Sequence, residues 1–338
     1  MSDRQTLIAG FLAGAGWGDA QRGRLAGDAS FRHYDRLQRR AGGAQPHNDT
    51  ERAVLMDAPP PKEDVRPFVR IARHLEQMGY SAPRLLAVDE KNGLLLLEDL
   101  GDDTYTRLLA NGHDETALYA LATDVLADLN ARADAIPAGL PLYDNDRLLT
   151  EACLLTDWYM PAIGRQADPV ARAEYIRLWQ DLFPIARAVP DTMVLRDFHV
   201  DNLMLLDRPG LKACGLLDFQ DAVAGPLTYD LMSLLEDARR DIDPALIAAM
   251  KDRYLARLPH LDRATFDASW AVMAAQRHAK VIGIFTRLCK RDGKPIYLGH
   301  IPRVWRLLEQ ACAHPALAGI KRWLDTHMPA QDRGVPTP

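Results

Sequence analysis

The chain has 338 residues, 48% apolar and 26% charged, which is enough to bury a core in roughly two domains. Its 41 Lys and Arg against 46 Asp and Glu give a net charge of −5, and no basic footprint indicates a nucleic-acid partner. No apolar run approaches the ~18 residues that a membrane span needs, and the four cysteines lack the spacing of a zinc site or of a disulfide framework.

The N-terminal segment 7–17 is apolar and follows Arg4, as the core of an export signal would. However, Leu7, Ile8, Phe11 and Leu12 recur at helical spacing. We therefore predict a short amphipathic helix on a cytoplasmic protein and keep an export signal as the alternative.

The next eighty residues are typical of a small sheet with one helix. Strands are predicted over residues 31–37, 52–56, 84–89 and 94–98, and Asn92-Gly93 is a strong hairpin turn between the last two. Apolar residues between 68 and 78 share one helix face, and Gly79 ends that helix. The predicted order is β, β, α, β, β.

Helical periodicity dominates after Gly101. Apolar stripes run over residues 118–129, 148–159 and 175–183, and helices resume from 229 to about 324. Short strands interrupt the helices at 193–195, 203–206 and 211–217, with a turn at 207–210 between the last two. The chain is thus predicted to be an α+β protein, with a smaller β-rich lobe over 1–98 and a larger helical lobe over 102–338.

The segment LRDFHVDN at 195–202 lies between two predicted strands, where catalytic groups are often positioned. Asn202 follows Asp197 by five residues, and Asp218 comes at the end of the next strand. Phosphoryl transfer needs one carboxylate to orient the attacking hydroxyl and oxygen ligands for Mg²⁺. Asp197 fits the first role, and Asn202 and Asp218 fit the second. The alternative is that Asp197 and Asn202 only cap turns.

This loop, with Asp218 after it, resembles the catalytic and metal loops of the aminoglycoside phosphotransferase and choline kinase group, which has a protein-kinase-like bilobal fold. The resemblance implies ATP and Mg²⁺ as cofactors and a hinge at 98–101. At that hinge the backbone of Glu98 and Leu100 would meet adenine. It also implies a nucleotide-covering loop, in which Gly27 and Ser30 would contact phosphate.

Two departures from this family pattern have consequences. Leu195-Arg196 replaces the usual His-Gly before the catalytic Asp, and segment 54–57 (VLMD) offers no third-strand lysine. The phosphates need cationic partners, and the nearby candidates are Arg32, Lys62 and Arg66. The missing lysine leaves a nucleotide-binding pseudokinase scaffold as an alternative function.

Further polar residues accompany the motif. Asp230 opens an apolar helix, as a helix cap or as a buried brace of the catalytic loop. Four residues are candidates for substrate contact: His199 in the loop, Gln220 and Asp221 just after Asp218, and Arg277 on a late helix.

The joint occurrence of GDASFRHY, LLLLEDLGDDTY, LRDFHVDNLM and GPLTYDLMSLLEDARRD is similar to the anomeric amino-sugar kinases of bacterial cell-wall recycling. This resemblance implies a cytoplasmic ATP-dependent kinase that phosphorylates the anomeric hydroxyl of N-acetylmuramate and N-acetylglucosamine. A kinase for another small alcohol, an aminoglycoside or amino alcohol, is the enzymatic alternative. The sequence predicts no oligomeric state.

Overall fold

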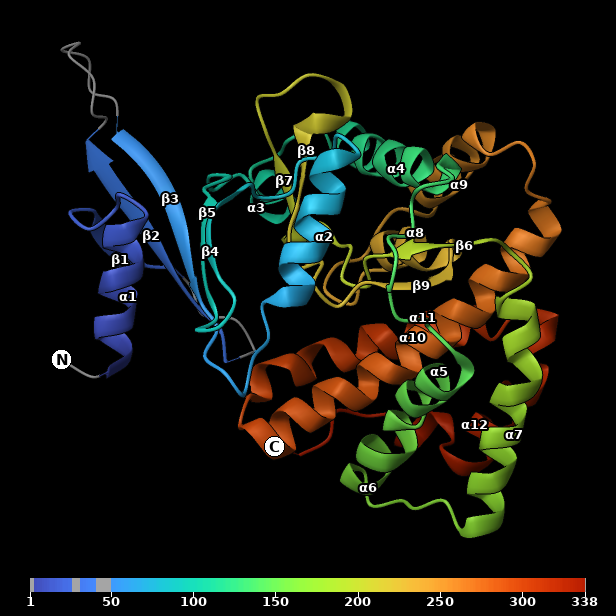
Figure 1. Cartoon of the computed structure of the whole chain (residues 1–338). Coiled ribbons are helices and arrows are strands. Elements are labelled where there is room, and N and C mark those ends of the chain that lie inside the picture. The colour runs from blue at the N-terminus through green and yellow to red at the C-terminus, as the bar shows by residue number, and fades with distance from the viewer. Residues whose placement is uncertain (1–2, 26–30, 41–49, 338) are drawn as a thin grey trace. The chain divides into compact units, whose positions relative to one another are not determined.

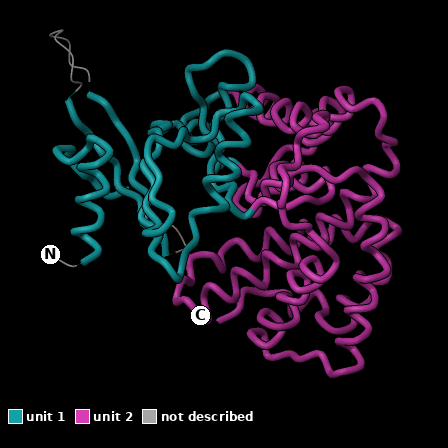
Figure 2. The backbone as a smooth tube through the Cα atoms, in the orientation of Figure 1, with its two compact units in different colours: residues 1–113, 200–221 teal, residues 114–199, 222–338 magenta. Residues whose placement is uncertain are grey.

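The computed structural model describes residues 3–25, 31–40 and 50–337, which form two compact units. Unit 1 is drawn from residues 1–113 and 200–221, and unit 2 from 114–199 and 222–338 (Figure 2). The chain passes from unit 2 to unit 1 between His199 and Val200, within the predicted catalytic segment. The division into a nucleotide-binding lobe over 1–98 and a catalytic lobe over 102–338 stays a prediction.

Unit 1 contains an antiparallel sheet of five strands in the order β1-β2-β3-β5-β4 (Figure 1). The strands are β1 (Gln21–Arg24), β2 (His33–Arg40), β3 (Thr50–Asp57), β4 (Leu85–Asp89) and β5 (Leu94–Glu98). Four of them match the predicted strands. The exposed strand β1 was not predicted, because its sequence QRGR has no apolar alternation and its order comes from pairing with β2.

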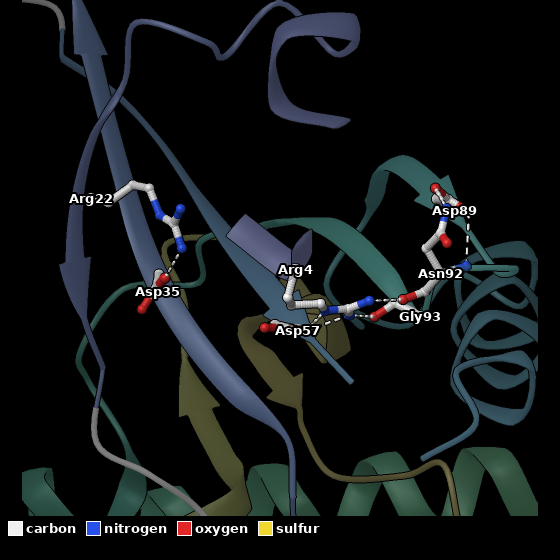
Figure 3. Close-up of polar contacts among 7 residues, drawn as sticks. All are labelled: Arg4, Arg22, Asp35, Asp57, Asp89, Asn92 and Gly93. Atoms are coloured by element: carbon white, nitrogen blue, oxygen red, sulfur yellow. Dashed lines mark hydrogen bonds and ion pairs between the residues drawn. The ribbon is translucent and has the colours of Figure 1, made fainter. Parts of the chain in front are cut away.

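Helix α1 (Asp3–Gly14) covers one face of this sheet. Ile8 and Leu12 belong to a buried cluster with Leu55 of β3 and Leu96 of β5. The predicted helix is confirmed, and it contains the apolar positions Leu7, Ile8, Phe11 and Leu12. Arg4 in its first turn pairs with Asp57 and donates to the carbonyl oxygen of Asn92, so one end of the β3–β5 pairing is joined to α1 (Figure 3).

Alternation along β3 leaves the other face of the sheet to a different set of residues. Val54 lies between Ala53 and Leu55 and lines a pocket instead of the α1 core. The remaining elements of unit 1 are α2 (Arg66–Gln77), α3 (Tyr105–Ala110), β7 (Leu203–Leu205) and β8 (Cys214–Leu216). The predicted strand 211–217 is wrong at its start, because Gly210–Ala213 forms a 3₁₀ turn that closes the β7–β8 hairpin.

Unit 2 is mainly helical. Its elements are α4 (Glu115–Ala131), α5 (Asn145–Ala152), α6 (Met160–Ala162), α7 (Pro169–Ala186), β6 (Asp191–Val194), β9 (Val223–Pro226), α8 (Thr228–Leu235), α9 (Pro244–Arg257), α10 (Arg263–Asp292), α11 (Ile301–Ala311) and α12 (Ala318–His327). Strand β9 was not predicted, since it is four residues long and ordered by pairing with β6.

Helix α10, 30 residues long, is the central element of unit 2 and packs against α5, α7, α8 and α11. The stripe over 148–159 was predicted as one helix, but α5 ends at Ala152 and Leu155–Tyr159 forms a π turn. α10 approaches this segment so closely at Gly283 that an added Cβ would lie 2.3 Å from the carbonyl carbon of Leu154.

All four cysteines are buried free thiols. Within the described ranges, no helix combines the length and the apolar character needed to cross a membrane.

Candidate active site

Unit 1 contains a pocket of about 400 Å³ on the sheet face opposite α1. Its apolar walls come from Val54 of β3, Leu97 of β5, Met204 of β7 and Leu217 after β8. Asn202 and Asp218 also line it, so two residues predicted to hold a metal lie at the wall of one cavity. An apolar slot with a few polar groups at its edge is the form of a small-ligand site.

The edge of the pocket is organised by Arg36 of β2, which the sequence reading did not identify. Its Nε lies 2.8 Å from the carboxylate of Asp99, its Nη1 lies 2.9 Å from that of Asp102, and its Nη2 donates to the Gly101 carbonyl at 3.1 Å. One guanidinium thus holds the segment after β5 against β2. The signal available in the sequence was the shared strand face of Tyr34 and Arg36, which both line the pocket.

The predicted hinge residues Glu98 and Leu100 both line this pocket. The Glu98 N–H donates to the Arg84 carbonyl at 2.9 Å, so this N–H is engaged within the sheet. The Glu98 carboxylate accepts from Arg84 and from Arg208 at 2.8 Å. Both ion pairs keep the side chain of Glu98 occupied.

The side chains of Asn202 and Asp218 approach to 3.5 Å, from the amide nitrogen to a carboxylate oxygen. Asp218 has a positive φ of 57°, an unusual backbone for a residue with a side chain. Phe219 stacks on Phe68 of α2 at 4.9 Å and is fully buried, which holds the segment in place. Gln220 donates to Asp218 at 2.7 Å, while Asp221 is exposed.

Of the predicted phosphate-binding residues, Gly27 and Ser30 lie outside the described residues. Arg32 is close to Asp218, with its Nη1 3.9 Å from the Asp218 carboxylate and its Nε 3.4 Å from that of Glu63. Arg66 is 72% exposed and paired with Asp64, and Lys62 lies over the Phe31 ring at 4.5 Å. Among the three candidate cations, the structure brings Arg32 to the site.

In unit 2, the half-buried Asp197 follows a turn whose backbone is bound by Asp230. The N–H groups of Leu195 and Arg196 donate to the two carboxylate oxygens of Asp230 at 2.6 and 2.9 Å. Burial raises the pKa of Asp230 to about 7, although both hydrogen bonds lower it. Asp230 therefore braces the loop, which was one of the two roles predicted for it.

Arg196 occupies the position before Asp197 with a φ of 72°. Its guanidinium pairs with the buried carboxylate of Glu151, which also receives Lys280 at 3.2 Å and the hydroxyl of Tyr143. Burial raises the pKa of Glu151, but the charges of Lys280 and Arg196 lower it by more, so the net pKa is below its ordinary value. Glu151 and Lys280 come from distant helices, and no spacing in the sequence indicated them.

His199 and Arg277, both predicted substrate contacts, are 5% and 4% exposed. Burial, Arg239 and Arg277 together hold the pKa of His199 well below its usual value, so this imidazole is neutral. His278 beside Arg277 is fully buried and lies 2.7 Å from Glu236, which also accepts from the Trp270 indole at 2.6 Å.

Comparison with known proteins identifies relatives along most of the chain. The sequence pattern of the phosphotransferase enzyme family matches residues 23–267. An N-acetylmuramate/N-acetylglucosamine kinase of Caulobacter vibrioides is 37% identical, over 98% of this chain and 99% of that protein. The protein of the same name from Pseudomonas aeruginosa is 40% identical, over 90% of this chain and 88% of its own length.

Solved structures with the same fold are more distant in sequence. A choline/ethanolamine kinase family protein from Mesorhizobium loti is 13% identical, with a TM-score of 0.58 over 96% of this chain and 99% of that one. The GDP complex of aminoglycoside 2′-phosphotransferase-IIIa is 14% identical, with a TM-score of 0.56 over 92% and 99%. The predicted α+β, protein-kinase-like fold is confirmed.

Proposed function

Because the chain belongs to the phosphotransferase enzyme family, we propose that it transfers the γ-phosphoryl group of ATP to the anomeric hydroxyl of N-acetylmuramate and N-acetylglucosamine. The names of the two relatives support this choice of acceptor. The reaction would take place in the cytoplasm, where ATP is available, and would return amino sugars released from peptidoglycan to metabolism.

The single observation that carries the kinase function is the pocket of unit 1, which has Asn202 and Asp218 on its wall. Its apolar sides fit a purine ring, and the segment 98–102 presents backbone groups along one edge. Asp99 and Asp102, which line the pocket and are oriented by Arg36, are candidate partners for the hydroxyl groups of a ribose.

Asn202 and Asp218 fit Mg²⁺ by the chemistry of their donor atoms. An amide and a carboxylate offer oxygen ligands, and Mg²⁺ in kinases takes only one or two carboxylates because the phosphates supply the rest. When bound, Mg²⁺ neutralises charge on the β- and γ-phosphate oxygens. Arg32 is the candidate cation for the remaining charge.

Asp197 is proposed to accept the proton of the acceptor hydroxyl. As the sugar O1 forms its bond to the γ-phosphorus, the bond from that phosphorus to the β,γ-bridging oxygen breaks and ADP leaves. The anomeric hydroxyl is more acidic than other sugar hydroxyls, so one carboxylate suffices as base. Asp230, through two loop N–H groups, positions the residue before Asp197.

The position of the new phosphate tests this function. We expect N-acetylglucosamine incubated with enzyme, ATP and Mg²⁺ to lose reducing power in step with ADP formation, because a 1-phosphate blocks the reducing end. Warm dilute acid should then restore the reducing power. The 1-O-methyl glycoside, which keeps the 6-hydroxyl but lacks a free anomeric one, should not react, and glucose should react poorly because the acetamido partners stay unpaired.

Phosphorylation of the methyl glycoside, or a product that keeps its reducing end, would rule out the anomeric assignment. Turnover of an aminoglycoside or amino alcohol, and of neither sugar, would favour the alternative kinase. ADP binding without turnover of any acceptor would favour the pseudokinase.

A further inference from the structure

Arg277 of α10 is a buried cation without a counter-ion. The residue is 4% exposed, its Nη1 is fully buried with no hydrogen-bond partner, and no ion pair joins it to residues 3–25, 31–40 or 50–337. An isolated buried charge costs several kcal/mol, so proteins pair such charges. A buried guanidinium left unpaired by the chain itself is suited to an anionic group of a ligand.

Arg277 interacts electrostatically with groups at the predicted catalytic loop, within unit 2. Its charge acts on His199, two residues after Asp197, whose pKa is lowered first by burial, then by Arg239 and Arg277. It also acts on Asp230, where it opposes the effect of burial on the pKa. Arg277 is therefore within electrostatic range of His199 and of Asp230, the carboxylate that binds the N–H groups of the two residues before Asp197.

The carboxylates near Arg277 in unit 2 are bound to other donors. Asp230 accepts two backbone N–H groups, and Glu236 accepts from Trp270 and His278. Asp237 is 3.6 Å from Arg239. None of these three carboxylates forms a hydrogen bond or an ion pair with Arg277, whereas Lys280, one turn further along α10, is paired with Glu151.

We propose that Arg277 binds the carboxylate of an anionic acceptor sugar and thereby sets the preference for N-acetylmuramate over N-acetylglucosamine. This inference rests on the proposed function. N-acetylmuramate carries a lactyl carboxylate at O3, which N-acetylglucosamine lacks, and a guanidinium can bind a carboxylate through two parallel hydrogen bonds. The carboxylate removes the cost of the unpaired cation, and this gain is available to one sugar only.

The test compares both sugars in Arg277→Met, Arg277→Lys and the control Arg291→Met. Arg291 is on the same helix, but it is 57% exposed and paired with Asp292. We expect Arg277→Met to lower kcat/KM for N-acetylmuramate about 10- to 100-fold, the loss typical of a charge-assisted hydrogen bond, and that for N-acetylglucosamine less than threefold. Arg277→Lys should recover part of the loss, and KM for ATP should not change.

Thermal unfolding gives a readout independent of turnover. Because Arg277 has no partner in the sugar-free protein, Arg277→Met should keep or raise the melting temperature, whereas loss of a structural cation would lower it. N-acetylmuramate should raise the melting temperature of the wild type and of Arg291→Met, but not of Arg277→Met.

Several outcomes would overturn the inference. A lowered melting temperature, or equal losses on both sugars, would mean that Arg277 is structural. A raised KM for ATP would mean that it binds phosphate. If the wild type phosphorylates neither sugar, the proposed function fails and the inference fails with it, while an active wild type with an unchanged preference in Arg277→Met would overturn the inference alone.

Discussion

Arg196 and Asp218 are not glycines, yet their backbone lies in the left-handed region, at φ of 72° and 57°. Such a conformation costs about 1–3 kcal/mol and persists where surrounding contacts enforce it. Arg196 is held by Asp230 at its N–H and by Glu151 at its guanidinium, and Asp218 is followed by the stacked Phe219. In both cases the strain lies beside a proposed catalytic group.

Replacing Asp197 by Asn tests the base. The amide cannot take the hydroxyl proton, so kcat should fall by roughly 10²–10⁴ while KM for ATP changes little. Asp207→Asn, an exposed carboxylate further along the chain, is the control. Steady-state kinetics of the folded variant test this role. Turnover close to that of the wild type would show that Asp197 is not the base.

The metal pair leads to a second prediction. Asp218→Ala should abolish Mg²⁺-dependent turnover, and Asn202→Ala should weaken it and raise the Mg²⁺ concentration needed for half-maximal rate. Rates measured across a Mg²⁺ titration check both. If Asp218→Ala keeps its activity at low Mg²⁺, the metal is bound elsewhere.

Asp230 should make stability depend on pH. Its pKa is raised by burial to about 7 from an ordinary value of 3.8, so the folded protein binds more protons than the unfolded chain between these values. The contribution of this group to stability is therefore full below pH about 4 and is lost as the pH rises toward 7.

Urea unfolding of the wild type and of Asp230→Asn, from pH 5 to 8, isolates this effect. The difference in unfolding free energy between the two proteins should be larger at pH 5 than at pH 8, because only the wild type loses a bound proton over this range. A difference that does not change with pH would show that Asp230 stays ionised throughout.

At the scale of elements, the approach of α10 to the π turn after α5 depends on Gly283. An alanine Cβ there would lie 2.3 and 2.4 Å from the carbonyl carbon and oxygen of Leu154, which are backbone atoms that cannot turn away. The contact lies between the end of α5 at Ala152 and the π turn that starts at Leu155, where the helix predicted over residues 148–159 is interrupted.

Gly283→Ala should therefore destabilise the protein by about 1–3 kcal/mol, as overpacking does, despite the better helix propensity of alanine. Gly10→Ala is the matched control, since Gly10 lies in α1 and an added Cβ meets nothing within 4 Å. That variant should be neutral or more stable by up to ~1 kcal/mol. Urea unfolding of both variants checks this, and equal effects would contradict it.

At the scale of the whole molecule, the residues proposed for nucleotide binding and for chemistry belong to different units. The pocket lining lies in unit 1, and Asp197 and Asp230 lie in unit 2. Binding of nucleotide should therefore be separable from turnover by mutation.

Filling the pocket by Val54→Phe should remove the increase in melting temperature that ADP produces, whereas Asp197→Asn should keep it. For a ligand at 100 times its Kd, that stabilisation is about 2.7 kcal/mol. Val170→Phe, at a position 79% exposed in unit 2, controls for the added ring. A full ADP shift in Val54→Phe would place the nucleotide outside this pocket.

Local order followed from local sequence. The strands β3 and β5, the turn at Asn92-Gly93 and helix α2 were predictable, because apolar spacing and turn residues act over a few neighbouring positions. The short strands β1 and β9 were not, because four-residue segments are ordered by hydrogen bonds to β2 and β6.

For the site, Asp197, Asn202 and Asp218 could be predicted from the sequence, because their chemistry and spacing are properties of one segment. Their surroundings depend on tertiary packing. Arg36 reaches the segment after β5, Glu151 joins Arg196 to Lys280, and Arg277 is buried without a partner. These relations depend on packing between segments tens of residues apart, and the periodicity of one segment carries no information on which distant side chain will meet it.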